Sequence, residues 1–132
     1  MSGDCLFCAI IAGAIPSRQI YADDSAIAFL DIQPWHRGHT LVVPRRHVAS
    51  IIDDPTIWGD VRTVVEQVVP LLDNRLGAAG LNLLVNAGEV SGQEVMHFHV
   101  HLVPRYDDAP GLANLTGRDT ADLDAVWQQL TA

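Results

Sequence analysis

Lysine is absent from this chain: all 8 basic residues are arginine, against 16 aspartate and glutamate residues. The absence excludes a Schiff-base lysine, the lysine of a phosphate-binding P-loop and a lysyl-nucleotide intermediate. The net charge of -8 repels the backbone of a long nucleic acid, so we expect no nucleic acid polymer as a partner. A small phosphorylated ligand is compatible with this charge, because a few local donors can hold it.

Long apolar runs are also absent, and no segment approaches the ~20 apolar residues that a membrane span requires. The first residues, Met1 to Asp4, have neither the basic region nor the apolar core of a signal peptide. With 132 residues, of which 48% are hydrophobic, the chain can form one domain with its own core. These features predict a soluble, single-domain cytoplasmic protein without membrane association.

The most informative segment is 96–104, where three histidines alternate with apolar residues: His97, His99 and His101. Alternation with a period of two predicts a β-strand with one apolar face and one histidine face. Imidazoles spaced about 6.5 Å apart make a poor packing surface, and each ring nitrogen needs a partner. Because all 6 histidines of the chain lie within 36–47 and 97–101, we expect two strands to gather them into a metal site or a phosphate-handling site.

Periodicity and turn residues predict, in order, a helix over 5–13, strands over 19–21, 26–32 and 39–44, a helix over 55–76, strands over 81–86 and 95–103, and a helix over 120–130. Short connections between strands favour antiparallel pairing. The predicted fold class is therefore α+β: a five-stranded antiparallel sheet with one long helix and short terminal helices.

The motif His97-x-His99-x-His101 resembles the signature of the histidine triad (HIT) family. Further segments resemble the rest of that family's pattern: Phe29 to Ile32, Pro34, His39, Val43 to His47, Asn86 and Gly92-Gln93. The similarity covers about residues 5–106, within one domain over 1–132 whose tail is 107–132. It implies a HIT-like fold whose sheet continues across a homodimer.

The resemblance implies hydrolysis or transfer of a nucleotide at its α-phosphorus, through a covalent nucleotidyl-histidine. His99 would be the nucleophile, and His101 and His39 would orient it, contact the phosphate and manage protons. A neutral imidazole can attack phosphorus, and its neighbours can donate hydrogen bonds where charge develops. The expected ligand is a purine nucleotide or nucleotidyl conjugate, either an adenosine phosphoramidate or a dinucleoside polyphosphate.

The resemblance also implies a nucleotide-binding set: Phe7, Phe29, Leu30, Asp31, Ile32, Leu41, Asn86, Gln93, His99 and His101. Asp31 would accept hydrogen bonds from the ribose hydroxyls, and the apolar members would wall the base, although core packing alone also explains them. Asn86 and Gln93 would hold phosphate or leaving-group atoms. Glu94 stands where many members have a hydroxyl residue, which leaves the leaving-group preference open.

Four residues form a potential Cys₂His₂ set for tetrahedral zinc: Cys5, Cys8, His47 and His97. Their long-range spacing is unlike that of a zinc finger. The resemblance implies a structural zinc ion at these positions, since one branch of the family binds zinc there. The alternatives are that Cys5 and Cys8 are small buried thiols or, less in keeping with so few residues before Cys5, a redox pair.

Two other functions fit the same residues. In a metallohydrolase, all three strand histidines would bind one catalytic metal ion. In a sensor, the pocket would bind a nucleotide and turnover would be incidental.

Overall fold

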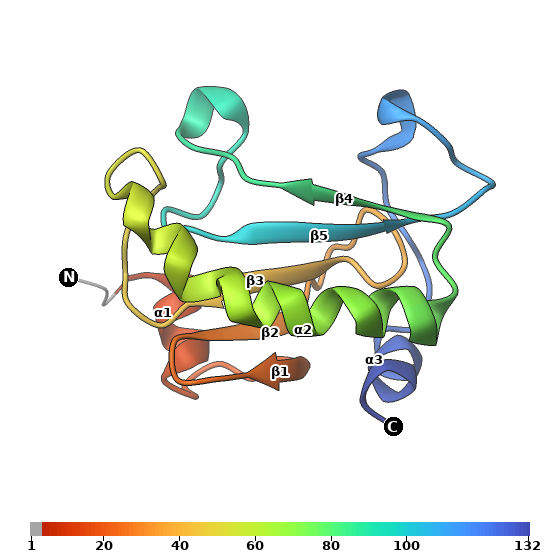
Figure 1. Ribbon diagram of the computed structural model, residues 1–132, viewed down its shortest axis with the longest axis horizontal. Helices are drawn as coiled ribbons and strands as arrows, with labels where there is room; N and C mark the ends of the chain where they lie inside the picture. The colour runs from red at the N-terminus through yellow and green to blue at the C-terminus, as the bar shows by residue number, and fades with distance from the viewer. Residues whose placement is uncertain (1–3) are drawn as a thin grey trace.

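A computed structural model describes residues 4–132 and shows a single antiparallel sheet with the strand order β1-β2-β3-β5-β4 (Figure 1). The strands are β1 (Gln19–Ala22), β2 (Ala26–Leu30), β3 (Thr40–Pro44), β4 (Gly80–Leu84) and β5 (Val100–Arg105). The helices are α1 (Leu6–Ile11), α2 (Trp58–Leu76) and α3 (Leu123–Thr131), with short 3-10 turns at Pro55–Ile57, Glu89–Ser91 and Leu112–Asn114. The predicted five-stranded α+β fold is confirmed. Within residues 4–132, no helix combines the length and the apolar content needed to cross a membrane.

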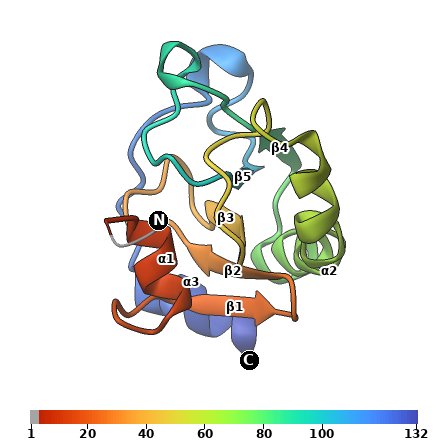
Figure 2. The same cartoon turned by 90° about the vertical axis from the view of Figure 1, so that its left-hand side faces the viewer.

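The two faces of the sheet are covered by different helices, α2 on one side and α1 on the other (Figure 2). The α2 face holds the larger core, in which valines and leucines of the helix pack on small and branched residues of the strands. On the α1 face, Phe7 packs with four strand residues: Ile27, Phe29, Leu41 and Val43. Because side chains alternate along a strand, His39 and His101 project on the same face as Leu41, toward α1.

The long helix ends where its sequence signals predict, but its first predicted turn, Pro55–Ile57, is a 3-10 turn and α2 begins at Trp58. Asp54 caps the first turn by accepting a hydrogen bond from the backbone N–H of Thr56, and Pro55 follows it. Gly77, with φ of 65°, closes the helix in the left-handed conformation. The helix continues through Pro70.

The histidine strand is shorter at its start than predicted, since the ladder begins at Val100 and not at residue 95. Its last pair with β3 is Val42 with Val100, and before that point the backbone N–H of Phe98 donates to the carbonyl of Val48 instead. Residues 95–99 therefore lie outside the ladder, so the alternation predicted side-chain direction correctly and strand pairing incorrectly. The strands predicted to end at Ile32 and Asn86 also stop two residues earlier, at Leu30 and Leu84.

Candidate active site and metal cluster

His39 and His101 form a buried hydrogen-bonded pair whose proton positions follow from their partners. The backbone N–H of Trp35 donates to Nδ1 of His39, 3.0 Å away, so the proton of this neutral ring is on Nε2. That Nε2–H donates to Nδ1 of His101 at 2.9 Å. The remaining proton of His101 is therefore on Nε2, where it can serve as a donor to a ligand.

His99 has the opposite tautomer. Its Nδ1 lies 2.8 Å from the carbonyl oxygen of His97, and a carbonyl oxygen only accepts, so Nδ1 carries the proton. Nε2 then has a free lone pair, and within residues 4–132 it forms no hydrogen bond. The pocket thus offers one nucleophilic nitrogen on His99 and one donor on His101, with ring centroids 4.8 Å apart.

Burial keeps these imidazoles neutral. It lowers the pKa of His39 to about 3, with smaller contributions from His36 and His99. It also lowers the pKa of His101 to about 3, helped by His99 and His39. The pKa of His99 is lowered by burial as well, against the opposing effects of its bond to His97 and of the nearby Asp31. At neutral pH the nucleophilic lone pair is not masked by a proton.

These groups open into a cavity of about 390 Å³, within the range of roughly 300–1,000 Å³ found for small-molecule sites. Nine of the ten residues predicted for nucleotide binding line it: Phe7, Phe29, Leu30, Asp31, Ile32, Leu41, Asn86, His99 and His101. Phe7 meets the His99 ring edge-on, with centroids 5.0 Å apart. Asp31 accepts from the backbone of Gln33 through Oδ1 (2.8 Å), while its Oδ2 lies 3.7 Å from Nε2 of His39.

Gln93 is the exception, because its side chain braces a loop and does not face the cavity. Its Nε2 donates to the carbonyls of Ala49 (2.6 Å) and Val95 (2.9 Å), and its Oε1 accepts from the backbone N–H of Gly88 (2.8 Å). With its amide saturated and only 3% of the residue exposed, Gln93 corrects the expectation that it holds phosphate. Its neighbour Glu94 lines the cavity instead.

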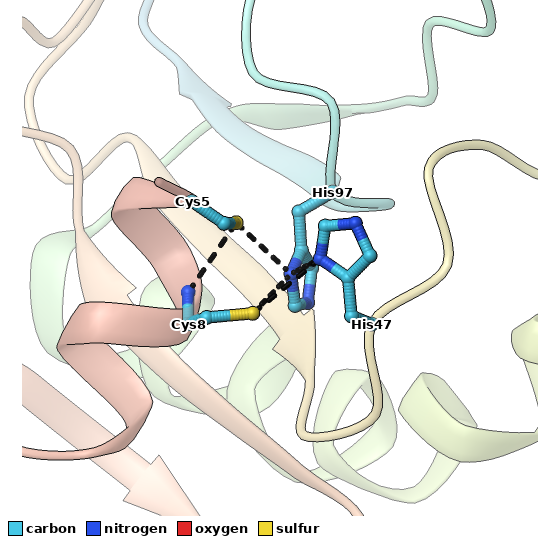
Figure 3. Close-up of side chains that lie close together, drawn as sticks. All are labelled: Cys5, Cys8, His47 and His97. Carbon is cyan, nitrogen blue, oxygen red and sulfur yellow. Dashed lines mark hydrogen bonds between the residues drawn. The ribbon is translucent and has the colours of Figure 1, made fainter. Parts of the chain in front are cut away.

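The second predicted set, Cys5, Cys8, His47 and His97, converges at the other end of the histidine segment (Figure 3). Cys8 lies in α1 and Cys5 caps its N-terminus, and the potential ligand atoms of the four residues all lie within 4.8 Å of one another. Nε2 of His97 donates to the carbonyl of Pro44 (2.8 Å), which leaves its Nδ1 lone pair directed at the cluster. Burial lowers the pKa of His97, so this lone pair is free at neutral pH.

The distances within the cluster fit a small tetrahedral cation. Nδ1 of His97 is 3.4 Å from each sulfur and 3.1 Å from Nδ1 of His47. Nδ1 of His47 lies 3.4 Å from the sulfur of Cys8. Ligand bonds of 2.0–2.3 Å around zinc would place such atoms roughly 3.3–3.8 Å apart. Two imidazole nitrogens and two thiol sulfurs facing one point are the donors that zinc prefers.

The three triad histidines do not form one metal site among the described residues 4–132, because His97 joins the cysteines while His101 bonds to His39. A grouping of Asp31, His39 and His101 is also close-packed, but its two rings already share a hydrogen bond. This division argues against the metallohydrolase alternative.

The residue that sequence reasoning missed is Trp35, which contacts both His39 and His101. Its position four residues before His39 was the one feature of the sequence that placed it near the site.

Comparisons with known proteins agree with this arrangement. Residues 12–108 match the family model described as HIT domain. The chain is 38% identical to an uncharacterized HIT-like protein of Methanocaldococcus jannaschii, over 96% of this chain and 98% of that one. It is 35% identical to an adenosine 5'-monophosphoramidase of Candida albicans, over 92% and 84% of the two chains. Among solved structures, a zinc-bound histidine triad family protein from Mycobacterium smegmatis superimposes with a TM-score of 0.86 at 33% identity, over 99% of this chain and 93% of that one.

Proposed function

The chain belongs to the histidine triad family, and from that premise we propose that it hydrolyses nucleotidyl conjugates at the α-phosphorus through a nucleotidyl-His99 intermediate. The observation that carries the proposal is the tautomer of His99. Its Nδ1–H is held by a backbone carbonyl, and its Nε2 lone pair is free in a ligand-sized cavity beside a hydrogen-bond donor. A fixed, neutral imidazole needs no further activation before it attacks phosphorus.

The proposed reaction has two displacements. Nε2 of His99 bonds to phosphorus as the bond to the leaving nitrogen or oxygen breaks. The leaving atom takes its proton from solvent, while Nε2–H of His101, the single proton of a neutral ring, donates a hydrogen bond without being transferred. Water then attacks phosphorus, the bond to His99 breaks, and the water proton returns to solvent. The net reaction consumes one water and yields a nucleoside monophosphate and the protonated leaving group.

The charge of the cavity favours a conjugate with a single phosphate and an amine leaving group. Its lining contains the carboxylates of Asp31 and Glu94, and among the described lining residues there is no arginine. Clustered phosphates are held in proteins by basic side chains, which a dinucleoside polyphosphate would not find here. We therefore propose an adenosine phosphoramidate as the substrate class, with Asp31 accepting from the ribose and Phe7 and Phe29 walling the base.

The test is steady-state hydrolysis of a fluorogenic adenosine phosphoramidate by the wild type and by His99→Ala. We expect His99→Ala to lose more than about a thousandfold in kcat, because the covalent route is removed. Mass spectrometry of the quenched wild type should detect one added nucleotidyl group. Equal rates for both proteins would refute the covalent mechanism, and tight nucleotide binding without turnover by the wild type would favour the sensor function.

We further propose that Cys5, Cys8, His47 and His97 hold a structural zinc ion. The metal would tie α1 to the histidine segment and supply structural stability, while the described contacts leave His99 outside the cluster. The adjacent Arg46 holds the His47 loop in place through ion pairs to Asp54 and Asp60, both at 3.0 Å. Elemental analysis should find about one zinc per chain, and a metal-free protein purified without chelator would contradict the assignment.

The partner we propose is a second copy of the chain joined along β4. This strand is at the edge of the sheet, so one side of its backbone is unpaired. Leu81 and Leu83 remain 37% and 49% exposed on it. Sedimentation should show a dimer that Leu83→Arg converts to a monomer, and a monomeric wild type would refute this interface.

A further inference from the structure

The indole of Trp35 covers both members of the His39–His101 pair. Its ring stacks on His101, with centroids 5.1 Å apart and planes inclined by 8°. It also lies over His39, with centroids 4.8 Å apart and planes inclined by 44°. Rotation of an imidazole about its χ2 bond has only broad, shallow preferences, so neighbouring contacts decide the plane of the ring. A stacked indole is such a contact for His101.

The backbone of the same residue determines the proton order of the pair. The N–H of Trp35 occupies Nδ1 of His39, which forces the His39 proton onto Nε2 and makes Nδ1 of His101 an acceptor. Without that donor, His39 could carry its proton on Nδ1, and the proton of His101 would no longer be directed to Nε2. One residue therefore controls both the tautomer and the ring plane of the proposed donor.

The loop that carries Trp35 is held by the segment that follows β5. The carbonyl of Pro34 accepts from the backbone N–H of Asp119 at 3.0 Å. Nε2 of His36 lies 2.7 Å from the carbonyl of Asn114, to which it donates. The hydroxyl of Tyr106 donates to the carbonyl of Arg37 at 2.8 Å. Residues before and after Trp35 are thus fixed at three points by the chain between 106 and 119.

Trp35 also borders two spaces. It lines the cavity that contains His99 and His101, and it lines a second cavity of about 560 Å³ bounded by the segment 106–119. The residue therefore lies between the proposed active site and the segment that holds its loop.

We propose that Trp35 is a positioning residue: its indole fixes the ring plane of His101, its backbone fixes the tautomer of His39, and the segment 106–119 holds its loop in place. The kinetic consequence rests on the proposed function, since His101 must donate to the leaving atom or the phosphate. The structural consequence, the state of the His101 ring, does not depend on any reaction.

The experiment compares Trp35→Phe, Trp35→Leu and Trp127→Leu with the wild type. Phenylalanine keeps a ring that can stack, whereas leucine keeps apolar bulk without a ring. Trp127 is the matched control, because its indole also packs on the core but donates to the carbonyl of Gln19, away from the pocket. We expect Trp35→Leu to lower kcat on the phosphoramidate by about 10- to 100-fold with a smaller change in KM, and Trp35→Phe and Trp127→Leu to stay within about threefold of the wild type.

A second measurement is independent of turnover. In ¹⁵N-histidine NMR spectra, the wild type should show a protonated Nε2 on His101, and its carbon-bound ring protons should be shifted upfield by the stacked indole. Trp35→Leu should lose the upfield shift but keep the proton of His101 on Nε2, because its backbone N–H remains, and Trp35→Phe should retain the shift in part. If Trp35→Leu fails to fold, the spectrum of Trp35→Phe decides alone.

Unchanged kcat and an unchanged His101 spectrum in Trp35→Leu would overturn the proposal, and so would equal losses in the leucine and phenylalanine variants. A wild type that hydrolyses no nucleotidyl conjugate would refute the proposed function only, because the spectra still report whether Trp35 orients His101.

Discussion

Acid should destabilise this protein through the buried pair His39 and His101. Burial lowers both pKa values from 6.5 to about 3, so between these pH values the unfolded chain binds protons that the folded chain excludes. Unfolding therefore takes up protons in this window, and the free energy of unfolding falls as the pH is lowered from 6.5 toward 3. Above pH 6.5 the pair is neutral in both states and this contribution is fully present.

The magnitude follows from linkage. Each excluded proton changes the free energy of unfolding by about 1.4 kcal/mol per pH unit, so each histidine contributes a loss of about 2 kcal/mol by pH 5. The pair together would then lose about 4 kcal/mol, a large part of a typical domain stability of about 5–15 kcal/mol. The hydrogen bonds of the pair also leave no free nitrogen for a further proton. Nε2–H of His39 donates to Nδ1 of His101, and the backbone N–H of Trp35 donates to Nδ1 of His39.

The assay is urea unfolding at half-unit steps from pH 7.5 to pH 5, for the wild type and His39→Gln. Glutamine at position 39 can accept from Trp35 and donate to His101 without titrating. The wild-type curve should be steeper than that of His39→Gln by about 1.4 kcal/mol per pH unit. Any acid sensitivity of the Cys₂His₂ cluster is common to both proteins and cancels. Parallel curves for the wild type and His39→Gln would refute the reasoning.

Three other variants test different parts of the structure. Cys8→Ser should abolish zinc binding and lower Tm by about 10 °C or more, measured by elemental analysis and calorimetry; an unchanged Tm would show that the cluster contributes no stability. Gly38→Ala should cost about 2 kcal/mol or more in urea unfolding, because Gly38 has φ of 87° and an added Cβ would overlap the side chain of Leu76. Glu94→Gln should raise kcat/KM severalfold for conjugates with anionic leaving groups and leave neutral amine conjugates unchanged. The exposed Glu89→Gln on the same loop is its control, and an equal effect of both would assign the change to general surface charge.

The sequence predicted which way most side chains of the site point, but it did not predict all of the strand pairing around them. The alternation over 96–104 predicted correctly that the three histidines point away from the α2 core, in which Phe98, Val100 and Leu102 are buried. It could not show that the ladder stops at Val100, since β3 itself continues to Pro44 and the backbone of Phe98 bonds to Val48 instead. Strand pairing is set by distant residues, and periodicity reports only local geometry.

The residues that sequence reasoning misjudged are those whose roles depend on backbone partners. Gln93 was predicted to hold phosphate, yet its amide bonds to three backbone groups, those of Ala49, Gly88 and Val95. Trp35 gave no pattern of its own, because its contacts are made by a ring plane and by one main-chain N–H. The sequence also did not indicate the function of the segment from Tyr106 onward, since each of its bonds to the Trp35 loop involves a backbone group, which every residue possesses.

The partners of the two histidines explain how one segment serves two sites. Nε2 of His97 donates to the carbonyl of Pro44, so its Nδ1 faces the cysteines, whereas Nδ1 of His99 donates to the carbonyl of His97. The two rings therefore belong to separate sites, but the sites remain joined through the backbone. The carbonyl of His97 accepts a hydrogen bond from Nδ1 of His99. Phe7, which lies between the two cysteines in the sequence, contacts the His99 ring with ring centroids 5.0 Å apart. The Cys₂His₂ cluster thus supports His99 in two ways, through the backbone of its ligand His97 and through Phe7 of α1. Substitution of a cluster residue should therefore lower the rate of the proposed reaction, although no cluster residue takes part in the chemistry.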